Sequence, residues 1–173
     1  MRNTGFALLC AFAVLTSGCG DLLSLHPLYD KSDTLVDPAL EGRWEDDDDV
    51  LLVERDGNGY RATLQSKREA SESQKYEVHL VNIDGVRFAD LLWEDSIGHM
   101  FVRTRVSNSE LRLSFFDSEW LRKRITHEES EVDGGRTRAV VTTRTPQLKR
   151  MVAKYAREPK AFDEHDVVYR RVR

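Results

Sequence analysis

The stretch "VLLVERDGNGYRATLQ", residues 50–65, places two apolar-rich segments on either side of the sequence Asp-Gly-Asn-Gly. Asp-Gly and Asn-Gly are strong hairpin signals, because glycine accepts the positive φ that a tight turn needs. In the second segment every other residue is apolar from Tyr60 to Leu64, which is typical of a strand with one buried face. The stretch therefore predicts an antiparallel β-hairpin.

The same pattern continues along the chain. The further strands that we expect are residues 75–83, 86–93, 99–106, 110–116, 137–143 and 166–172. Asp-Gly separates the first two of these segments, and Ser-Asn-Ser separates the next two. Short strands at such regular spacing, joined by tight turns, are typical of an antiparallel meander. We predict a mainly β fold in which this meander forms either a barrel or a sandwich.

One or two amphipathic helices are expected in the C-terminal half. The first spans residues 117–125, with Asp117 or Ser118 as its N-cap. The second spans residues 145–158, with Thr145 as the expected N-cap and proline at the first helical position. Its apolar stripe at helical spacing predicts that it lies across the sheet or plugs one end of it.

The N-terminus has the pattern of an export signal. Arg2 is the only charged residue before Asp21, and an apolar run over residues 5–15 is followed by small residues. The run is well short of the ~20 apolar residues that a membrane-spanning helix needs, and the alternative is a buried N-terminal helix or strand. We expect residues 1–18 to be a cleaved signal peptide.

The sequence Thr-Ser-Gly before Cys19 sharpens this expectation. It resembles the lipobox of bacterial lipoproteins, which implies that the chain is cut before Cys19 and that its sulfur is diacylated, usually with acylation of the new amino terminus. Two or more acyl chains anchor a protein stably, since each buried methylene contributes ~0.8 kcal/mol. Cys10 lies in the removed segment, so the mature chain would have no free thiol and no internal disulfide.

The remainder divides into an entry segment and one domain. Residues 19–41, with two prolines, are expected to form the lipidated N-terminus and a tether, although their apolar residues are numerous enough to pack back onto the domain. Residues 42–173 are expected to form a single β-rich domain. The proline-punctuated entry followed by Gly-Arg-Trp resembles the start of a group of uncharacterised bacterial lipoproteins.

The Gly-Arg-Trp sequence ending at Trp44 also resembles the Gly-x-Trp signature that opens the first strand of lipocalins. That resemblance implies a cup-shaped antiparallel barrel able to hold a small apolar ligand. The alternative is a tryptophan that closes the core of another kind of β-domain.

Charge is divided unevenly along the chain. Residues 20–100 contain 8 Lys/Arg and 19 Asp/Glu, whereas residues 101–173 contain 17 and 11. The division indicates an acidic and a basic side, or only that strands from the two halves pair. The basic face of the second helix is compatible with nucleic acid, but export argues against that partner. Anionic lipid headgroups fit better, and a solvated helix face is the plainer interpretation.

Candidate catalytic and metal-binding residues are few. The acidic run Glu45–Asp49 has the oxygen ligands that calcium needs but lacks the spacing of a calcium loop, which favours a solvated turn. The histidines, none of which has metal-site spacing, are His26, His79, His99, His127 and His165. Nucleophile elbows, phosphate loops and dinucleotide fingerprints are absent from the sequence. We therefore predict no catalytic residue, no metal site and no cofactor.

These observations lead to a functional expectation. The chain is expected to be a membrane-anchored lipoprotein of the cell envelope with a non-enzymatic binding, assembly or structural role. The alternative is a lipocalin-like carrier of a small hydrophobic ligand, and an enzyme ranks third. The expected partners are membrane lipid through acylated Cys19 and either an envelope protein or a small hydrophobic ligand, not nucleic acid. In the lipoproteins that this lipobox resembles, Asp directly after the anchor commonly signals retention in the inner membrane of enteric bacteria. Gly20 is at that position here, so the resemblance implies the periplasmic face of the outer membrane.

Overall fold

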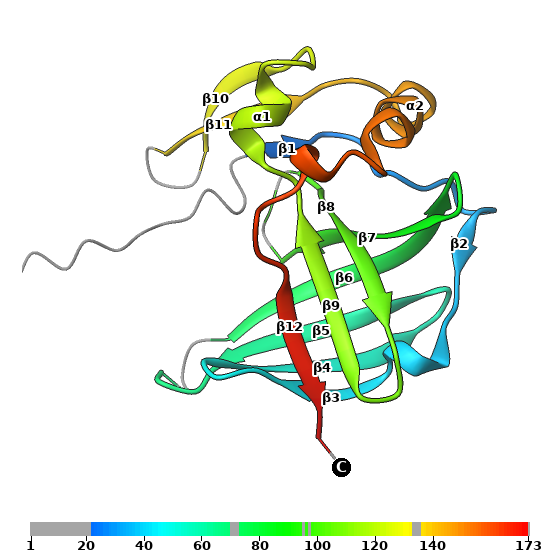
Figure 1. Ribbon diagram of the computed structural model, residues 1–173, viewed down its shortest axis with the longest axis vertical. Coiled ribbons are helices and arrows are strands. Elements are labelled where there is room, and N and C mark those ends of the chain that lie inside the picture. Colours follow the sequence, from blue (N-terminus) through cyan, green and yellow to red (C-terminus); the bar gives the residue numbers. More distant parts are fainter. Residues whose placement is uncertain (1–21, 70–72, 95, 97, 133–135, 173) are drawn as a thin grey trace, which may run out of the picture.

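Eight antiparallel strands close into a barrel (Figure 1). The computed structural model describes residues 22–69, 73–94, 96, 98–132 and 136–172. The barrel strands are β3 (Gly42–Glu45), β4 (Asp49–Asp56), β5 (Gly59–Ser66), β6 (Ser73–Ile83), β7 (Val86–Trp93), β8 (Met100–Val106), β9 (Glu110–Phe115) and β12 (Val167–Arg171). Each pairs with the next, and β12 closes the circle between β9 and β3. The predicted β meander is confirmed, and of the two predicted forms it adopts the barrel. The expected strand at residues 137–143 is the exception, because it forms part of a separate sheet outside the barrel.

The expected hairpin turns are present. Asp56 pairs with Gly59 across a two-residue turn in which Gly57 has φ 57°. In the β6–β7 turn, Asp84 has φ 50° and Gly85 has φ 79°, so both central residues take the positive φ that matches the twist of the strands. These turns form as predicted because their chemistry is local.

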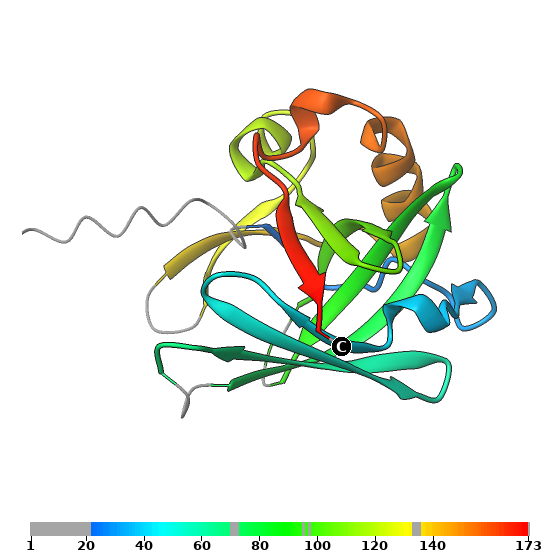
Figure 2. The ribbon, with the colours of Figure 1, turned by 60° about the horizontal axis from the view of Figure 1, so that its bottom comes forward.

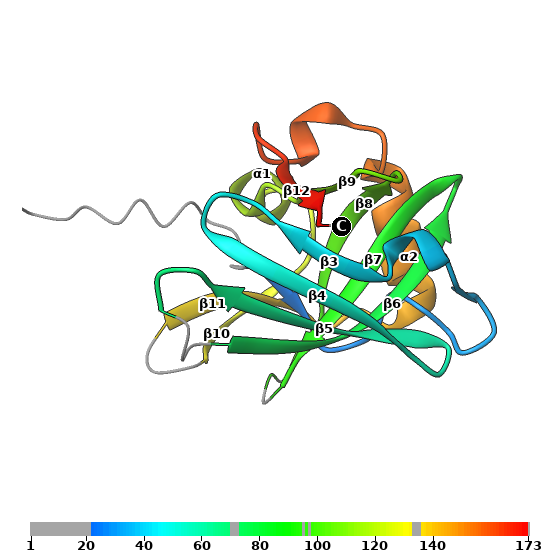
Figure 3. The same ribbon diagram turned by 90° about the horizontal axis from the view of Figure 1, so that it is seen from below.

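A second layer, called here the cap, covers the outer face of β6–β9. It contains the sheet β1 (Leu22–Ser24), β11 (Arg136–Val141) and β10 (Glu128–Val132), the helices α1 (Ser118–Arg122) and α2 (Thr145–Tyr155), and the 3-10 helix η2 (Pro159–Ala161). Figures 2 and 3 show both α-helices on the β7–β9 side of the barrel, away from β3 and β4. The prediction of two helices in the C-terminal half is confirmed, and α2 lies across the sheet.

The barrel wall beneath the cap is apolar on both faces. Leu80 and Ala89 point into the barrel, whereas their neighbours Val81 and Phe88 pack in one cluster with Leu148 of α2. All five residues are at most 4 % exposed. The protein therefore has two apolar cores, one inside the barrel and one under the cap, which share the β6–β7 wall.

Both helices differ from the expected bounds or caps, α1 at its end and α2 at its start. Asp117 caps α1, accepting from the backbone N of Trp120 at 2.9 Å, but that helix ends at Arg122. The prediction of Thr145 as N-cap of α2 is wrong, because the N-cap position is Arg144 and no side chain caps it. The Thr145 hydroxyl instead donates to the Pro27 carbonyl at 2.8 Å, so it ties the N-terminal segment to the helix.

The described part of the expected tether, residues 22–41, is folded onto the barrel. Leu23 and Leu28 are 2 % and 0 % exposed, and β1 pairs in parallel with β11. The short strand β2 (Thr34–Leu35) pairs with β6, and the 3-10 helix η1 (Pro38–Leu40) leads into β3. The apolar residues of this segment thus bury it, and it is not a free spacer.

One end of the barrel is closed by a tryptophan and an arginine. Trp44 is fully buried, and its Nε1 donates to the Leu40 carbonyl at 2.9 Å. The Arg171 guanidinium lies 4.0 Å from the centroid of the Trp44 ring and donates to backbone carbonyls of Ala39, Glu41 and Asn108. Gly42 has φ 131°, and a Cβ there would lie 2.6 Å from Arg171 Nη1. Glycine is therefore required before Trp44 for both backbone conformation and space.

Gly42→Ala is expected to lower the free energy of unfolding by about 3 kcal/mol, since it combines a strained φ with displacement of Arg171. Urea denaturation measures this change. Gly57→Ala is the matched control, because its φ is also positive but nothing lies within 4 Å of the added Cβ, and it should lower stability by about 1 kcal/mol. Equal effects of the two substitutions would show that Arg171 does not clamp this end.

Candidate functional site

The barrel encloses an apolar cavity of about 110 Å³. Its lining includes Leu51, Val53, Ala62, Val78, Ala89 and Val102. The Thr104 hydroxyl, also in the lining, donates to the Val102 carbonyl at 3.2 Å, so it is satisfied within the wall. The cavity can therefore take an apolar group and gives it mainly aliphatic and aromatic contacts.

The volume limits what the cavity can hold. An apolar protein cavity of roughly 150 Å³ stays dry and binds benzene, so this one fits an apolar group of about four or five carbons. Sites for drug-sized ligands begin at roughly 300 Å³. The short side chains of Ala62 and Ala89 help to keep the space open, because any larger apolar residue would project into it.

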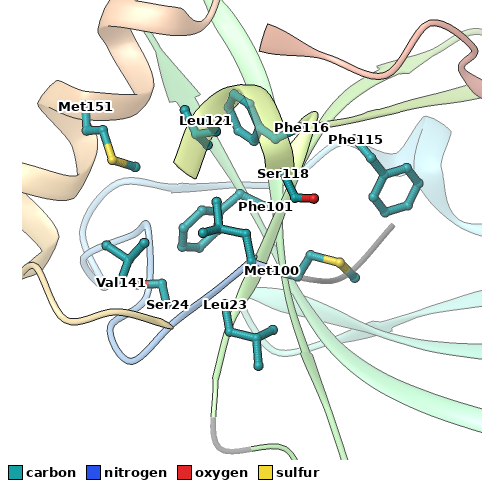
Figure 4. Close-up of a pocket in the computed structure, with 11 residues that line it drawn as sticks. Leu23, Ser24, Met100, Phe101, Phe115, Phe116, Ser118, Leu121, Val141 and Met151 are labelled. Atoms are coloured by element: carbon teal, nitrogen blue, oxygen red, sulfur yellow. The ribbon is translucent and has the colours of Figure 1, made fainter. Parts of the chain in front are cut away.

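A smaller cavity of about 30 Å³ lies between the barrel and the cap. Figure 4 shows Leu23, Val141 and Met151, from three cap elements, around this space. Met100 and Phe115 line both this cavity and the barrel cavity. Their side chains therefore separate the two spaces, and the flexible methionine can adapt to a ligand on either side.

A buried carboxylate lies on the outer face of β7. Asp90 is 1 % exposed, and its Oδ2 accepts from the backbone N of Leu28 at 2.6 Å. Its Oδ1 lies 2.6 Å from Nδ1 of His99. His99 in turn exchanges two backbone hydrogen bonds with Ser24, at 2.8 and 2.7 Å. Asp90 and His99 together fasten the N-terminal segment to the barrel.

His79 lies beside this pair, since it is the cross-strand partner of Asp90. Its ring packs on Tyr29 with 4.1 Å between centroids, its Nε2 lies 2.8 Å from Glu77 Oε1, and its Nδ1 is buried without a hydrogen-bond partner. Burial and the nearby carboxylates of Asp90 and Glu77 raise the pKa of Tyr29 to about 12. The phenol therefore stays neutral near pH 7 and does not act as a base.

The remaining histidines do not join this group. His127 Nε2 lies 3.2 Å from a Glu129 carboxylate oxygen, His165 is exposed, and His26 is half-buried. Among the described residues, no three metal-binding side chains come together in a way that could hold an ion.

The acidic run after Trp44 forms the turn between β3 and β4. Asp46 Oδ1 accepts from the backbone N of Asp48 at 2.9 Å. Arg68 contacts the Asp48 carboxylate at 2.6 Å, and Lys67 contacts Glu45 at 3.1 Å. Carboxylates of this run therefore pair with the lysine and arginine side chains just after β5. The side chains of the β3–β4 turn are partly exposed.

The predicted lipidation residue, Cys19, and the predicted signal peptide lie outside the described residues. Their roles stay predictions. Within the described part of the chain, no helix is long and apolar enough to span a membrane.

No protein-family model, no curated protein and no solved structure matches this chain. Its function is therefore inferred from its own cavity and side chains.

Sequence reasoning missed Asp90. The available signal was a single carboxylate inside the apolar segment 86–93. A charge in such a strand is retained only with partners, and those partners come from residues far along the chain, which the sequence does not place.

Asp90→Asn is expected to lower the free energy of unfolding by about 2 kcal/mol, because one amide oxygen cannot replace both acceptors of the buried carboxylate. Hydrogen exchange should also speed up in residues 22–30, while that in β4 and β5 changes little. Glu77→Gln is the control: this carboxylate is 60 % exposed, and its loss should change stability by less than about 0.5 kcal/mol. Unchanged protection of residues 22–30 in Asp90→Asn would contradict the fastening role.

Proposed function

We propose that this protein is a lipid-anchored, non-enzymatic binding protein of the cell envelope whose barrel carries a small hydrophobic molecule. The single observation that carries the binding role is the apolar cavity inside a closed barrel, whereas the anchor and the location rest on the lipobox resemblance at Cys19. Burial of apolar surface in a preformed cavity is the interaction that such a site offers a ligand.

The placement of polar groups supports binding over catalysis. The Asp90–His99 pair is the arrangement among the described residues most like a catalytic dyad. It lies on the outer face of the wall, and both of its members hold the N-terminal segment. The barrel cavity, by contrast, presents mainly apolar side chains to a ligand.

The size of the cavity also bounds the affinity. Burying about four or five methylenes contributes ~0.8 kcal/mol each, or about 3–4 kcal/mol before any loss of ligand freedom. This corresponds to a Kd of about 1 mM or weaker. A ligand that binds usefully at lower concentration needs either further contacts outside the cavity or movement of Met100 and Phe115.

The proposed anchor would place the cap at the membrane surface. Leu22, the first residue of β1, is three residues after Cys19, and three residues span at most about 11 Å. Since residues 22–41 pack on the barrel, they add no reach to the anchor. We therefore propose a domain held against the membrane, on the outer membrane where the cell has one.

Ala89→Leu is expected to fill the barrel cavity and abolish binding of 1-hexanol, followed by NMR chemical-shift titration, while thermal stability is unchanged or raised. Ala153→Leu, on α2 and outside the cavity lining, is the matched control and should leave the titration unchanged. If Ala89→Leu folds and still binds hexanol as the wild type does, the barrel is not the binding site.

Cys19→Ser is expected to move the protein from the membrane fraction to the soluble fraction, since the sulfur that carries the acyl chains is lost. Mass spectrometry of the wild type should show an N-terminal Cys19 with added acyl mass. A wild-type chain that keeps residues 1–18 and carries no acyl group would contradict the anchor.

A further inference from the structure

A groove of about 610 Å³ lies on the outside of the barrel, where β7 begins and β8 ends. None of its lining residues is Asp or Glu, and four are arginines: Arg87, Arg103, Arg105 and Arg157. They come from β7, from β8 and from the residues that follow α2. The lining therefore carries concentrated positive charge, although the whole chain has a net charge of −4.

Arg103 is the least satisfied of the four. Its Nε is buried without a hydrogen-bond partner, and its Nη atoms reach the Ala156 carbonyl at 3.4 Å and the Ser114 hydroxyl at 3.3 Å, which are long hydrogen bonds. No carboxylate of the described residues forms an ion pair with it. Its guanidinium lies 3.8 Å from the Phe162 ring centroid, so the aromatic ring holds it in place.

Electrostatics at Arg103 favour an anion. Burial lowers the pKa of the Arg103 guanidinium, and the neighbouring charge of Arg105 lowers it further, partly offset by Asp166. A bound oxyanion would offset the repulsion between the charges of Arg103 and Arg105. It would also accept hydrogen bonds from guanidinium donors that now have poor partners. Guanidinium groups bind carboxylate and phosphate through paired hydrogen bonds, which makes arginine the typical residue for such ligands.

The other three arginines are held in place but keep free donors. Arg87 pairs with the Asp37 carboxylate, and Arg105 pairs with Asp166 at 2.9 Å. Arg157 donates to the backbone carbonyl of Asp84. Each guanidinium has five N–H donors, and these contacts use only some of them. The partners therefore fix the orientation of the arginines without filling the groove.

The groove lies over a seam in the barrel wall. The register between β7 and β8 runs from Leu91↔Met100 to Phe88↔Arg103 and stops there. Beyond this point the strands diverge, as Figure 1 shows, and Val86 and Thr104 line the groove from its two sides. Widening the seam breaks no hydrogen bond of the β7–β8 ladder.

Thr104 lies between the two spaces, because it lines both the arginine groove and the apolar cavity. A molecule whose charged end lay among the arginines would have the seam, and then the cavity, directly beside it. The cavity alone binds an apolar group weakly, so a contact in this groove is the kind of addition that would raise the affinity.

We propose that the ligand is a small anionic amphiphile, whose oxyanion head binds these four arginines while its short apolar tail enters the barrel cavity through the β7–β8 seam. This inference rests on the proposed function, since it requires that the barrel bind an apolar group. The head is a carboxylate or a phosphate, and the tail has about five carbons.

The test compares four probes by NMR titration of the purified protein. Hexanoate and hexyl phosphate carry both parts, 1-hexanol has the tail without the charge, and acetate has the charge without the tail. Hexanoate or hexyl phosphate should bind at least tenfold more tightly than either partial probe, and the tighter of the two identifies the head. Both should perturb residues in the groove and in the cavity.

Two variants locate the head, and a third is their control. Arg103→Gln should weaken binding of the better amphiphile at least fivefold while leaving that of hexanol unchanged. Arg105→Gln provides a second variant at an exposed position, should Arg103→Gln fail to fold. Arg61→Gln is the matched control, because Arg61 is an exposed arginine paired with Asp56, and neither residue lines the groove. It should change neither titration.

The possible outcomes separate the two proposals. If no probe with a tail binds, the proposed function fails and this inference fails with it. If hexanol binds as tightly as the amphiphiles and Arg103→Gln changes nothing, the barrel binds apolar molecules but the arginine groove is not the head site. If acetate binds as tightly as hexanoate, the groove is an anion site unconnected with the cavity, which also overturns the inference.

Discussion

The β6–β7 wall is buried on both faces, and this constraint shapes the molecule. A strand with one polar face has its register fixed by that face, but Leu80 and Val81 are both buried, as are Phe88 and Ala89. Asp90 breaks this ambiguity. A slip of β7 by one residue would turn its carboxylate into the apolar barrel, away from Leu28 and His99. An unpaired buried charge is far more unfavourable than an exchanged apolar residue, so Asp90 specifies the register.

The same carboxylate explains how the cap and the barrel form one structure. The N-terminal segment runs between them, with Leu23 and Leu28 buried and β1 completing the cap sheet. Its backbone needs acceptors on the barrel side, and Asp90 provides one while His99 pairs with Ser24. On the cap side, Thr145 binds the Pro27 carbonyl. A segment with two prolines is thus fixed by a few polar contacts and three buried leucines, Leu23, Leu28 and Leu40, not by a long ladder.

How far the sequence predicts this structure follows from the range of each interaction. The Asp-Gly turns and the alternation from Tyr60 to Leu64 are local and were predicted correctly, with seven of the eight barrel strands following from such patterns and turns. Closure into a barrel depends on β12 pairing with both β9 and β3, which no local pattern specifies. The sequence wrongly predicts the Thr145 hydroxyl as a helix cap. Its actual partner, the Pro27 carbonyl, is 118 positions away, and no local pattern indicates it. The role predicted for Cys19 lies outside the described residues and rests on the lipobox resemblance alone.

The cavity and the arginine groove could not be predicted from the sequence either, because each is formed by residues that lie far apart along the chain. Taken together, however, they are easier to explain than either is alone. The chain has 30 Asp and Glu against 26 Lys and Arg, so carboxylates are abundant enough for the cations of the groove. The half-buried Arg103 guanidinium, whose Nε has no hydrogen-bond partner, lies next to an apolar space that is too small for tight binding by itself, and in the proposed binding mode the two are halves of one recognition site. In that proposed mode the apolar cavity would select the length of a tail, and the arginines would select the charge of its head.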